Sequence, residues 1–183
     1  MRIIRFVVAA VAAILLGQYQ AAAADKENMI YLDLKDGRVT IELYPDKAPN
    51  HVKRIKELVR AKFYDGVVFH RVIDGFMAQT GDPTGTGRGG SDKPDLKAEF
   101  SDINHVEGVL SMARTADPDS ANSQFFIMLA PSPHLDGQYT VWGKVVDGME
   151  LVHKIKKGST AANGAVENPD KIVKMRVAAD VDK

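Results

Sequence analysis

The chain has 183 residues, with 24 basic side chains, 24 acidic side chains and no cysteine. A chain of this length is expected to form one domain. The absence of cysteine excludes disulfides and thiol catalysis, and avoids mispairing in an oxidising compartment. No cluster of Lys and Arg stands out, which argues against nucleic acid as a partner.

The first 24 residues have the layout of a secretory signal peptide. Residues 1–5 form a short basic head, residues 6–17 an apolar run, and residues 21–24 are four alanines suited to cleavage. The apolar run is short for a membrane span, although an uncleaved N-terminal anchor remains the alternative. Without cysteine there is no lipoprotein attachment site. We therefore expect residues 25–183 to be one exported, periplasmic domain.

The N-terminal part of this domain predicts a hairpin followed by a helix. Residues 29–34 and 38–44 are rich in β-forming side chains and flank a turn containing Gly37. Pro49 is suited to a first helical turn, and apolar side chains then recur at helical spacing. The pattern predicts an amphipathic helix over residues 49–61.

The remainder of the chain alternates short strands with turns. A long polar stretch, residues 81–107, interrupts them and predicts a functional or surface-wrapping loop. A second short helix is expected over residues 149–157. The other expected strands are residues 67–72, 77–80, 109–113, 125–129, 140–146 and 171–178. This order predicts a mainly β fold, a closed eight-stranded antiparallel β-barrel capped by two α-helices.

Residues 69–79 place a cation, a large aromatic ring, a thioether and an amide within eleven positions. If the two short strands pair, Arg71 and Gln79 face one shallow site whose floor is Phe76 and Met77. An apolar floor with a guanidinium at its rim suits a neutral substrate with a polarisable amide better than an anion or a metal.

Three other patterns fail their context tests. Residues 85–90 read G-x-G-x-x-G, but no helix opens there to hold a pyrophosphate, so we expect a flexible loop. The five histidines are scattered without metal-ligand spacing, and His70 is expected to be structural. Ser123 lacks the G-x-S-x-G elbow of a hydrolase. A secreted hydrolase or nucleotide-binding protein would rest only on the glycine motif.

The expected strand at residues 125–129 is apolar on both faces. Phe126 and Met128 share one face, whereas Phe125 and Ile127 share the other. One face is expected to join the core. The other face either lies at the surface or lines a pocket, and the strand alone leaves both open.

Several segments together resemble the cyclophilins, a family of peptidyl-prolyl cis–trans isomerases. The segment Y-D-G-V-V-F-H-R-V-I-D-G-F-M-A-Q-T at residues 64–80 is similar to the family signature. The segments at residues 108–113, 122–127, 135–137 and 143–149 follow in the family's order, so the resemblance runs from about residue 29 to residue 179. It implies isomerisation of X–Pro bonds in peptides and unfolded proteins, with no cofactor and no metal.

The resemblance also implies roles for individual positions. Arg71 matches the catalytic arginine, and Gln79 matches a residue that hydrogen-bonds the substrate backbone. The main chain of Ala113 and Arg114 matches the segment that holds the residue before proline. The expected proline pocket is Phe76, Met77, Phe126 and Leu135, with Gln124, His134 and Tyr139 as further groove residues.

Two groove positions depart from the best-known eukaryotic pattern. His134 stands where those cyclophilins have tryptophan, and Tyr139 stands where they have histidine. The loss of a large indole donor at position 134 predicts weak cyclosporin binding at best. We expect a monomer, because no exposed helical stripe demands a dimer. The alternative function is a non-catalytic chaperone or scaffold that holds proline-containing peptides, but mere holding does not require Arg71.

Overall fold

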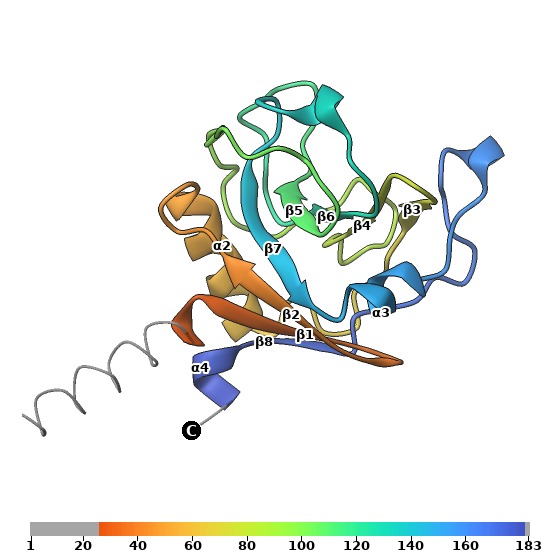
Figure 1. Cartoon of the computed structure of the whole chain (residues 1–183), viewed down its shortest axis with the longest axis horizontal. Helices are drawn as coiled ribbons and strands as arrows, with labels where there is room; N and C mark the ends of the chain where they lie inside the picture. Colours follow the sequence, from red (N-terminus) through yellow and green to blue (C-terminus); the bar gives the residue numbers. More distant parts are fainter. Residues whose placement is uncertain (1–25, 182–183) are drawn as a thin grey trace, which may run out of the picture.

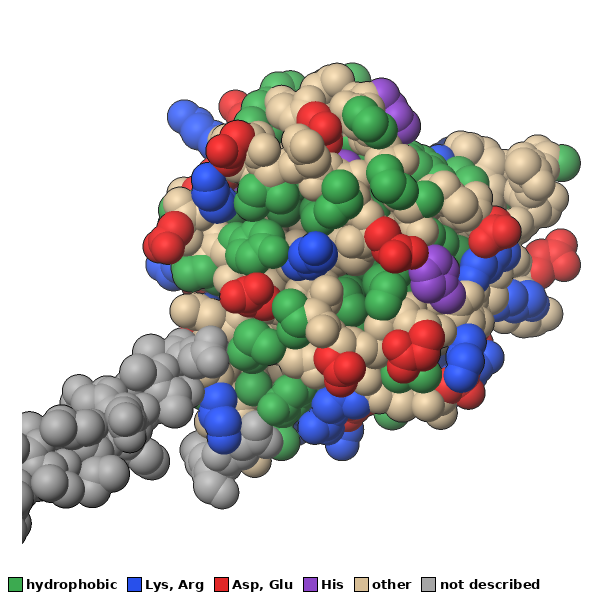
Figure 2. All heavy atoms as spheres, viewed as in Figure 1, with side chains coloured by type: hydrophobic (Ala, Val, Ile, Leu, Met, Phe, Trp, Pro, Cys, Tyr) green, Lys and Arg blue, Asp and Glu red, His purple; other side chains and the backbone are tan. Residues whose placement is uncertain are grey.

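The structure is a computed structural model that describes residues 26–181. The predicted signal peptide at residues 1–24 lies outside the described residues. Within the described part, no helix combines the length and apolarity needed to cross a membrane. Charged side chains of both signs are interspersed on the face shown in Figure 2, as the balanced composition predicts.

Eight antiparallel strands form one strongly curled sheet (Figure 1). The strand order is β3-β4-β6-β5-β7-β2-β1-β8. The strands are β1 Met29–Leu34, β2 Gly37–Leu43, β3 Arg71–Ile73, β4 Met77–Thr80, β5 Val109–Met112, β6 Phe125–Met128, β7 Val141–Asp147 and β8 Lys174–Val177. The mainly β class and the eight strands are therefore confirmed.

The predicted closure of the barrel is wrong, because β3 and β8 do not form a ladder and the sheet is a half-open barrel. Strand β3 is shorter than expected, and the chain before it leaves the sheet. Main-chain bonds from Gly66 to Ile172 (2.8 Å) and from Phe69 to Asp170 (2.9 Å) link the two edges outside the strands. The Asp65 carboxylate accepts the Met175 N–H at 3.1 Å and so occupies part of the edge of β8. At this position of β8 a side chain, rather than a residue of β3, accepts the main-chain N–H.

Helix α2, Pro49–Arg60, begins at the predicted proline and buries its apolar face against the sheet. Its N-cap residue, Ala48, supplies no side-chain acceptor. Instead, Glu99 of the long loop accepts the N–H groups of Asn50 and His51, each at 3.1 Å. This remote carboxylate satisfies N–H groups that the helix cannot pair itself.

The second predicted helix is shorter than expected, since α3 covers only Met149–His153. Helices α2 and α3 lie on either side of β2 and β7 in Figure 1. A third short helix, α4 at Ala178–Val181, follows β8 directly. Two 3-10 turns, η1 at Pro133–Leu135 and η2 at Thr160–Ala162, lie in the connections.

Strand β6 separates two apolar clusters. Phe125 and Ile127 belong to the inner cluster, the large core enclosed by the curled sheet and α2. Phe126 and Met128 belong to the outer cluster, whose buried members are Met77, Val109, Phe126, Met128, Leu135 and Val141. The two apolar faces seen in the sequence therefore meet two different apolar environments.

Candidate functional site

The β3–β4 hairpin presents the arginine and the amide that the sequence singled out. Arg71 is paired with Gln79, and Ile73 with Met77, in an antiparallel register. Directly paired residues project to the same face of a sheet. The strands therefore pair as predicted, and Arg71 and Gln79 lie on one face of the hairpin.

The outer cluster is incomplete on the side facing this hairpin and leaves a cavity of about 130 Å³. Met77 is almost fully buried, and Phe126 is 6% exposed. The lining residues are Arg71, Phe76, Met77, Gln79, Ala113, Arg114, Phe126, Leu135 and Tyr139. The structure thus brings together all four expected proline-pocket residues beside Arg71.

Arg71 is held on two sides at the rim of this cavity. One Nη1–H group donates to Gln79 Oε1 at 3.3 Å. The Nε–H donates to the main-chain oxygen of Asn163 at 3.0 Å, and Nη2 donates to Asn163 Oδ1 at 3.1 Å. Burial lowers the pKa of Arg71, while the nearby Tyr139 acts in the opposite direction. An arginine nevertheless remains charged at physiological pH.

The side-chain amide of Gln79 is hydrogen-bonded to a second side-chain amide, that of Gln124. Gln79 Nε2 donates to Gln124 Oε1 at 2.9 Å. Gln124 Nε2 in turn donates to the carbonyl oxygens of Gly87 (3.1 Å) and Gly89 (2.8 Å). The glycine-rich loop is therefore connected to the arginine through two side-chain amides.

The G-x-G-x-x-G segment is a loop, as expected, but one held by hydrogen bonds. The buried Asp82 carboxylate accepts the N–H groups of Thr84 (2.8 Å), Gly87 (2.7 Å) and Gly89 (3.1 Å). Burial alone would raise the pKa of Asp82, but these bonds hold it well below its usual range. Asp82 therefore fixes the carbonyls that position Gln124.

His70 is buried beside this loop. It is 8% exposed, and a Cβ added to Gly87 would lie about 3.5 Å from its Nε2. Neither ring nitrogen has a hydrogen-bond partner among the described residues. Burial lowers the pKa of His70, so the neutral packing role expected from the sequence fits its surroundings.

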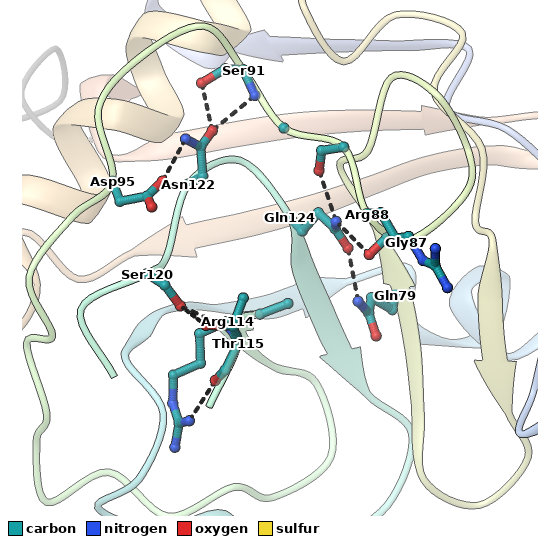
Figure 3. Close-up of a pocket in the computed structure, with 13 residues that line it drawn as sticks. Gln79, Gly87, Arg88, Ser91, Asp95, Arg114, Thr115, Ser120, Asn122 and Gln124 are labelled. Atoms are coloured by element: carbon teal, nitrogen blue, oxygen red, sulfur yellow. Dashed lines mark hydrogen bonds between the residues drawn. The ribbon is translucent and has the colours of Figure 1, made fainter. Parts of the chain in front are cut away.

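A second, larger cavity of about 480 Å³ adjoins the first (Figure 3). The two cavities share Gln79, Ala113 and Arg114. The residues that line the larger one come mainly from three regions, residues 87–91, 113–115 and 120–124. Figure 3 shows Gln79 and Gln124 on one side of it and Arg114 with Thr115 on the other. Through these shared residues the two cavities form one continuous groove.

The rim opposite Arg71 is formed by residues that follow β5. The Arg114 guanidinium stacks 4.5 Å from the centre of the Tyr139 ring and donates to the Gln138 carbonyl oxygen at 3.0 Å. The Ala113 N–H donates to the Gln124 carbonyl oxygen at 2.9 Å. The Ala113–Arg114 segment is thus fixed from both sides of the groove.

His134, one of the two positions that differ from the eukaryotic pattern, lies at the end of the apolar cavity. Its exposed ring stacks on Phe76, with ring centres 5.8 Å apart, but it does not line either cavity. The next residue, Leu135, is buried and lines the apolar cavity. Turn η1 therefore orients one residue into the site and leaves the other at its edge.

A serine, a histidine and an aspartate form a hydrogen-bonded series beneath Phe126. Ser111 Oγ lies 2.9 Å from His105 Nε2, and His105 Nδ1 lies 3.0 Å from Asp136 Oδ1. Ser111 and His105 are 0% and 1% exposed, so no substrate reaches the hydroxyl. The His105 ring stacks on Phe126. The series supports the pocket wall, and the geometry gives the hydrolase alternative no accessible nucleophile here.

Comparison with known proteins points to one family. Residues 29–177 match the family described as cyclophilin type peptidyl-prolyl cis-trans isomerase/CLD. A probable peptidyl-prolyl cis-trans isomerase of Brucella suis is 57% identical, with 94% of each chain covered. A peptidyl-prolyl cis-trans isomerase-like protein of Rhizopus delemar is 44% identical, with 87% of this chain and 98% of the relative covered.

Solved structures agree with this result. Cyclophilin AquaCyp293 from Hirschia baltica superposes with a TM-score of 0.77 at 30% identity, covering 86% of this chain and 76% of that one. A cyclophilin-type isomerase of Cryptosporidium parvum, crystallised in the presence of the dipeptide Ala-Pro, superposes with a TM-score of 0.75 at 28% identity. That match covers 81% of this chain and 98% of the other.

Proposed function

The chain belongs to the cyclophilin family of peptidyl-prolyl cis–trans isomerases, and we propose that it isomerises X–Pro bonds with Arg71 as its catalytic residue. The observation that carries the proposal is the position of the Arg71 guanidinium at the rim of an apolar cavity. Two of its five N–H groups remain for a substrate after the three bonds to Gln79 and Asn163 are counted.

The apolar cavity is proposed to bind the proline ring. Its volume, about 130 Å³, and its walls of Phe76, Met77, Phe126 and Leu135 suit a small apolar ring. The related Cryptosporidium parvum structure with Ala-Pro supports a proline-containing ligand. The Ala113–Arg114 main chain would hold the residue before proline, and Gln79, Gln124 and Tyr139 would border the peptide.

The reaction requires rotation about a bond, without making or breaking one. Resonance in the X–Pro amide gives a barrier of about 18–20 kcal/mol, and the proline nitrogen regains its lone pair only in the twisted state. Arg71 would donate a charge-assisted hydrogen bond to that nitrogen or to the rotating carbonyl. The bond strengthens as the amide twists, so it stabilises the transition state more than the ground state.

The groove also contributes to lowering the rotation barrier. Burial holds the ring while the fixed rim residues hold the flanking peptide, so that rotation is confined to one bond. Spontaneous exchange takes tens to hundreds of seconds. Ordinary enzymatic turnover requires a barrier lower by about 4–7 kcal/mol, which one charged hydrogen bond and desolvation can supply.

The test compares Arg71→Ala and Arg71→Lys with the wild-type protein. We expect kcat/KM for an X–Pro peptide to fall at least about 100-fold in both variants, because lysine lacks the planar donor fork. Exchange spectroscopy by NMR measures the rate, and a peptide titration measures affinity, which we expect to change little. Arg60→Ala serves as a control, since Arg60 pairs with Glu27 and Asp180 away from the groove. Near-normal turnover in either Arg71 variant would refute this mechanism. Peptide binding without acceleration by the wild type would identify a holding protein instead.

The long loop after Gln79 is proposed to shape the preference for residues flanking proline. It supplies Gly87, Gly89 and Ser91 to the larger cavity. Replacing residues 83–92 with a short Gly/Ser linker should alter the relative kcat/KM of peptides that differ beside proline. An unchanged order of preference would rule this role out.

The cellular setting is also a proposal. The composition of residues 1–24 supports export to a bacterial periplasm, and the Brucella suis relative is consistent with a bacterial source. N-terminal sequencing after cell fractionation tests cleavage near Asp25. Sedimentation tests the proposed monomer, and calorimetry with cyclosporin tests the weak binding expected from His134.

A further inference from the structure

We propose that Asn163 is a positioning residue that sets the orientation of the Arg71 guanidinium. This inference rests on the proposed catalytic role of Arg71. Asn163 lies 92 positions away in the sequence, yet its main-chain oxygen and side-chain Oδ1 both accept from Arg71, at 3.0 and 3.1 Å. Two acceptors on one residue meet two neighbouring donors, Nε–H and Nη2–H, on the same edge of the planar guanidinium, which fixes its plane as well as its position.

The backbone holding Asn163 is itself tied to β3. The Val72 N–H donates to the Gly164 carbonyl oxygen at 2.8 Å, and the Gly158 N–H donates to the Val72 carbonyl oxygen at 2.9 Å. Arg71 and Ala165 form an isolated antiparallel bridge. Residues 158–166 therefore pair with the outer edge of β3 like a partial strand, which holds Asn163 beside Arg71.

Residues 158–166 can lie this close to β3 only because two of them, Gly158 and Gly164, are glycines. A Cβ on Gly164 would lie 2.4 Å from the Ile73 side chain, and Gly164 has a φ of +82°. A Cβ on Gly158 would lie 1.9 Å from the Gly164 carbonyl oxygen. Only a residue without a Cβ fits there. The two glycines therefore allow direct packing of this segment against β3.

Asn163 adopts a backbone conformation that suits its role. Its φ is +52°, at the end of the η2 turn, and Asn is among the few residues other than Gly that tolerate this region. Gln79 binds the guanidinium from the opposite side. Because Asn163 and Gln79 together fix the guanidinium, the two N–H groups of Arg71 that they do not bind point in a defined direction. Without the side chain of Asn163, the guanidinium would rotate between orientations, and fewer molecules would be ready to donate to the substrate.

The key variant is Asn163→Gly, which keeps the main-chain acceptor and the positive φ but removes Oδ1. We expect kcat to fall about 3- to 10-fold with KM nearly unchanged, since the substrate pocket is intact. Asn163→Asp retains the acceptor and should restore kcat to within about twofold of wild type. Asn168→Gly is the matched control: Asn168 also has a positive φ, of 50°, in the same connection, and should leave kcat unchanged.

A double-mutant cycle separates positioning from a general structural effect. In an Arg71→Ala background, Asn163→Gly should cause no further loss, because its effect acts through the guanidinium. Rotation of the Arg71 guanidinium, followed by ¹⁵N NMR, should be faster in Asn163→Gly and unchanged in Asn168→Gly. Unchanged kcat and unchanged rotation in Asn163→Gly would overturn the proposal. If Arg71→Ala alone retained full activity, the catalytic role of Arg71 would fail, while the rotation measurement would still decide the contact.

Discussion

The two faces of strand β6 carry equally apolar side chains but have different surroundings. Phe125 and Ile127 are 0% exposed inside the curled sheet, where Phe125 meets Tyr64 and Trp142 edge to face. Phe126, on the other face, meets Tyr139 and borders the open cavity. The inner face is completed by the protein itself, whereas the outer face leaves room for a ligand. One strand therefore contributes to stability through alternate residues and to function through those between them.

The largest expected effect is a loss of stability when the inner face of β6 is changed. Phe125→Ala should lower the free energy of unfolding by about 3–5 kcal/mol, because a closed core cannot refill the void. Denaturation in urea measures this loss, and Phe125→Leu provides a milder variant that remains folded. For Phe125→Leu we expect kcat/KM per folded molecule to stay within about twofold of wild type. A large loss of kcat/KM in a stable Phe125→Leu protein would break the separation.

The second effect concerns the opposite face. Phe126→Ala should destabilise the protein by at least about 1 kcal/mol less than Phe125→Ala, because the space it leaves opens to water. Its kcat/KM should nevertheless fall about tenfold or more, since the proline ring loses an aromatic wall. Activity assays and urea denaturation on the same preparations test both statements. If Phe126→Ala were less stable than Phe125→Ala and yet fully active, the assignment of stability to the inner face and function to the outer face would be wrong.

The sequence predicted much of this contrast because it depends on local periodicity. Alternation along residues 125–128 defined the two faces, and the pairing of Arg71 with Gln79 followed from a short hairpin. Barrel closure was predicted wrongly, because β-forming residues at 67–70 do not reveal that the chain leaves the sheet there. Asp65 then occupies the edge of β8, a contact between residues 110 positions apart.

Asn163 was missed for a related physical reason. It lies in a connection without a hydrophobic pattern, and its partner Arg71 is 92 residues away. The local signals were a pair of glycines, Gly158 and Gly164, and an asparagine preceding the second of them. Such signals predict a turn but do not identify what it contacts. Likewise, nothing near Pro49 indicates that Glu99 caps its helix.

The smallest expected effect uses pH to distinguish the faces. The Asp136 carboxylate accepts the main-chain N–H of His105 and contacts its ring, and these interactions lower the pKa of Asp136 below its ordinary value of 3.8. Stabilisation from a lowered pKa is present above 3.8 and is lost as the pH falls through the folded-state value. The stability difference between wild type and Asp136→Asn should therefore shrink as the pH falls from about 5 to below 3.8.

The matched comparison is the difference between wild type and Phe125→Leu, which should remain constant over the same range because apolar burial binds no proton. Urea denaturation at several pH values measures both differences. A shrinking difference for Asp136→Asn alone would show that a charged support under Phe126 belongs to the outer face. A constant difference for both variants would mean that the Asp136 carboxylate contributes nothing to that face, and that the packing of His105 on Phe126 is sufficient to hold the pocket wall.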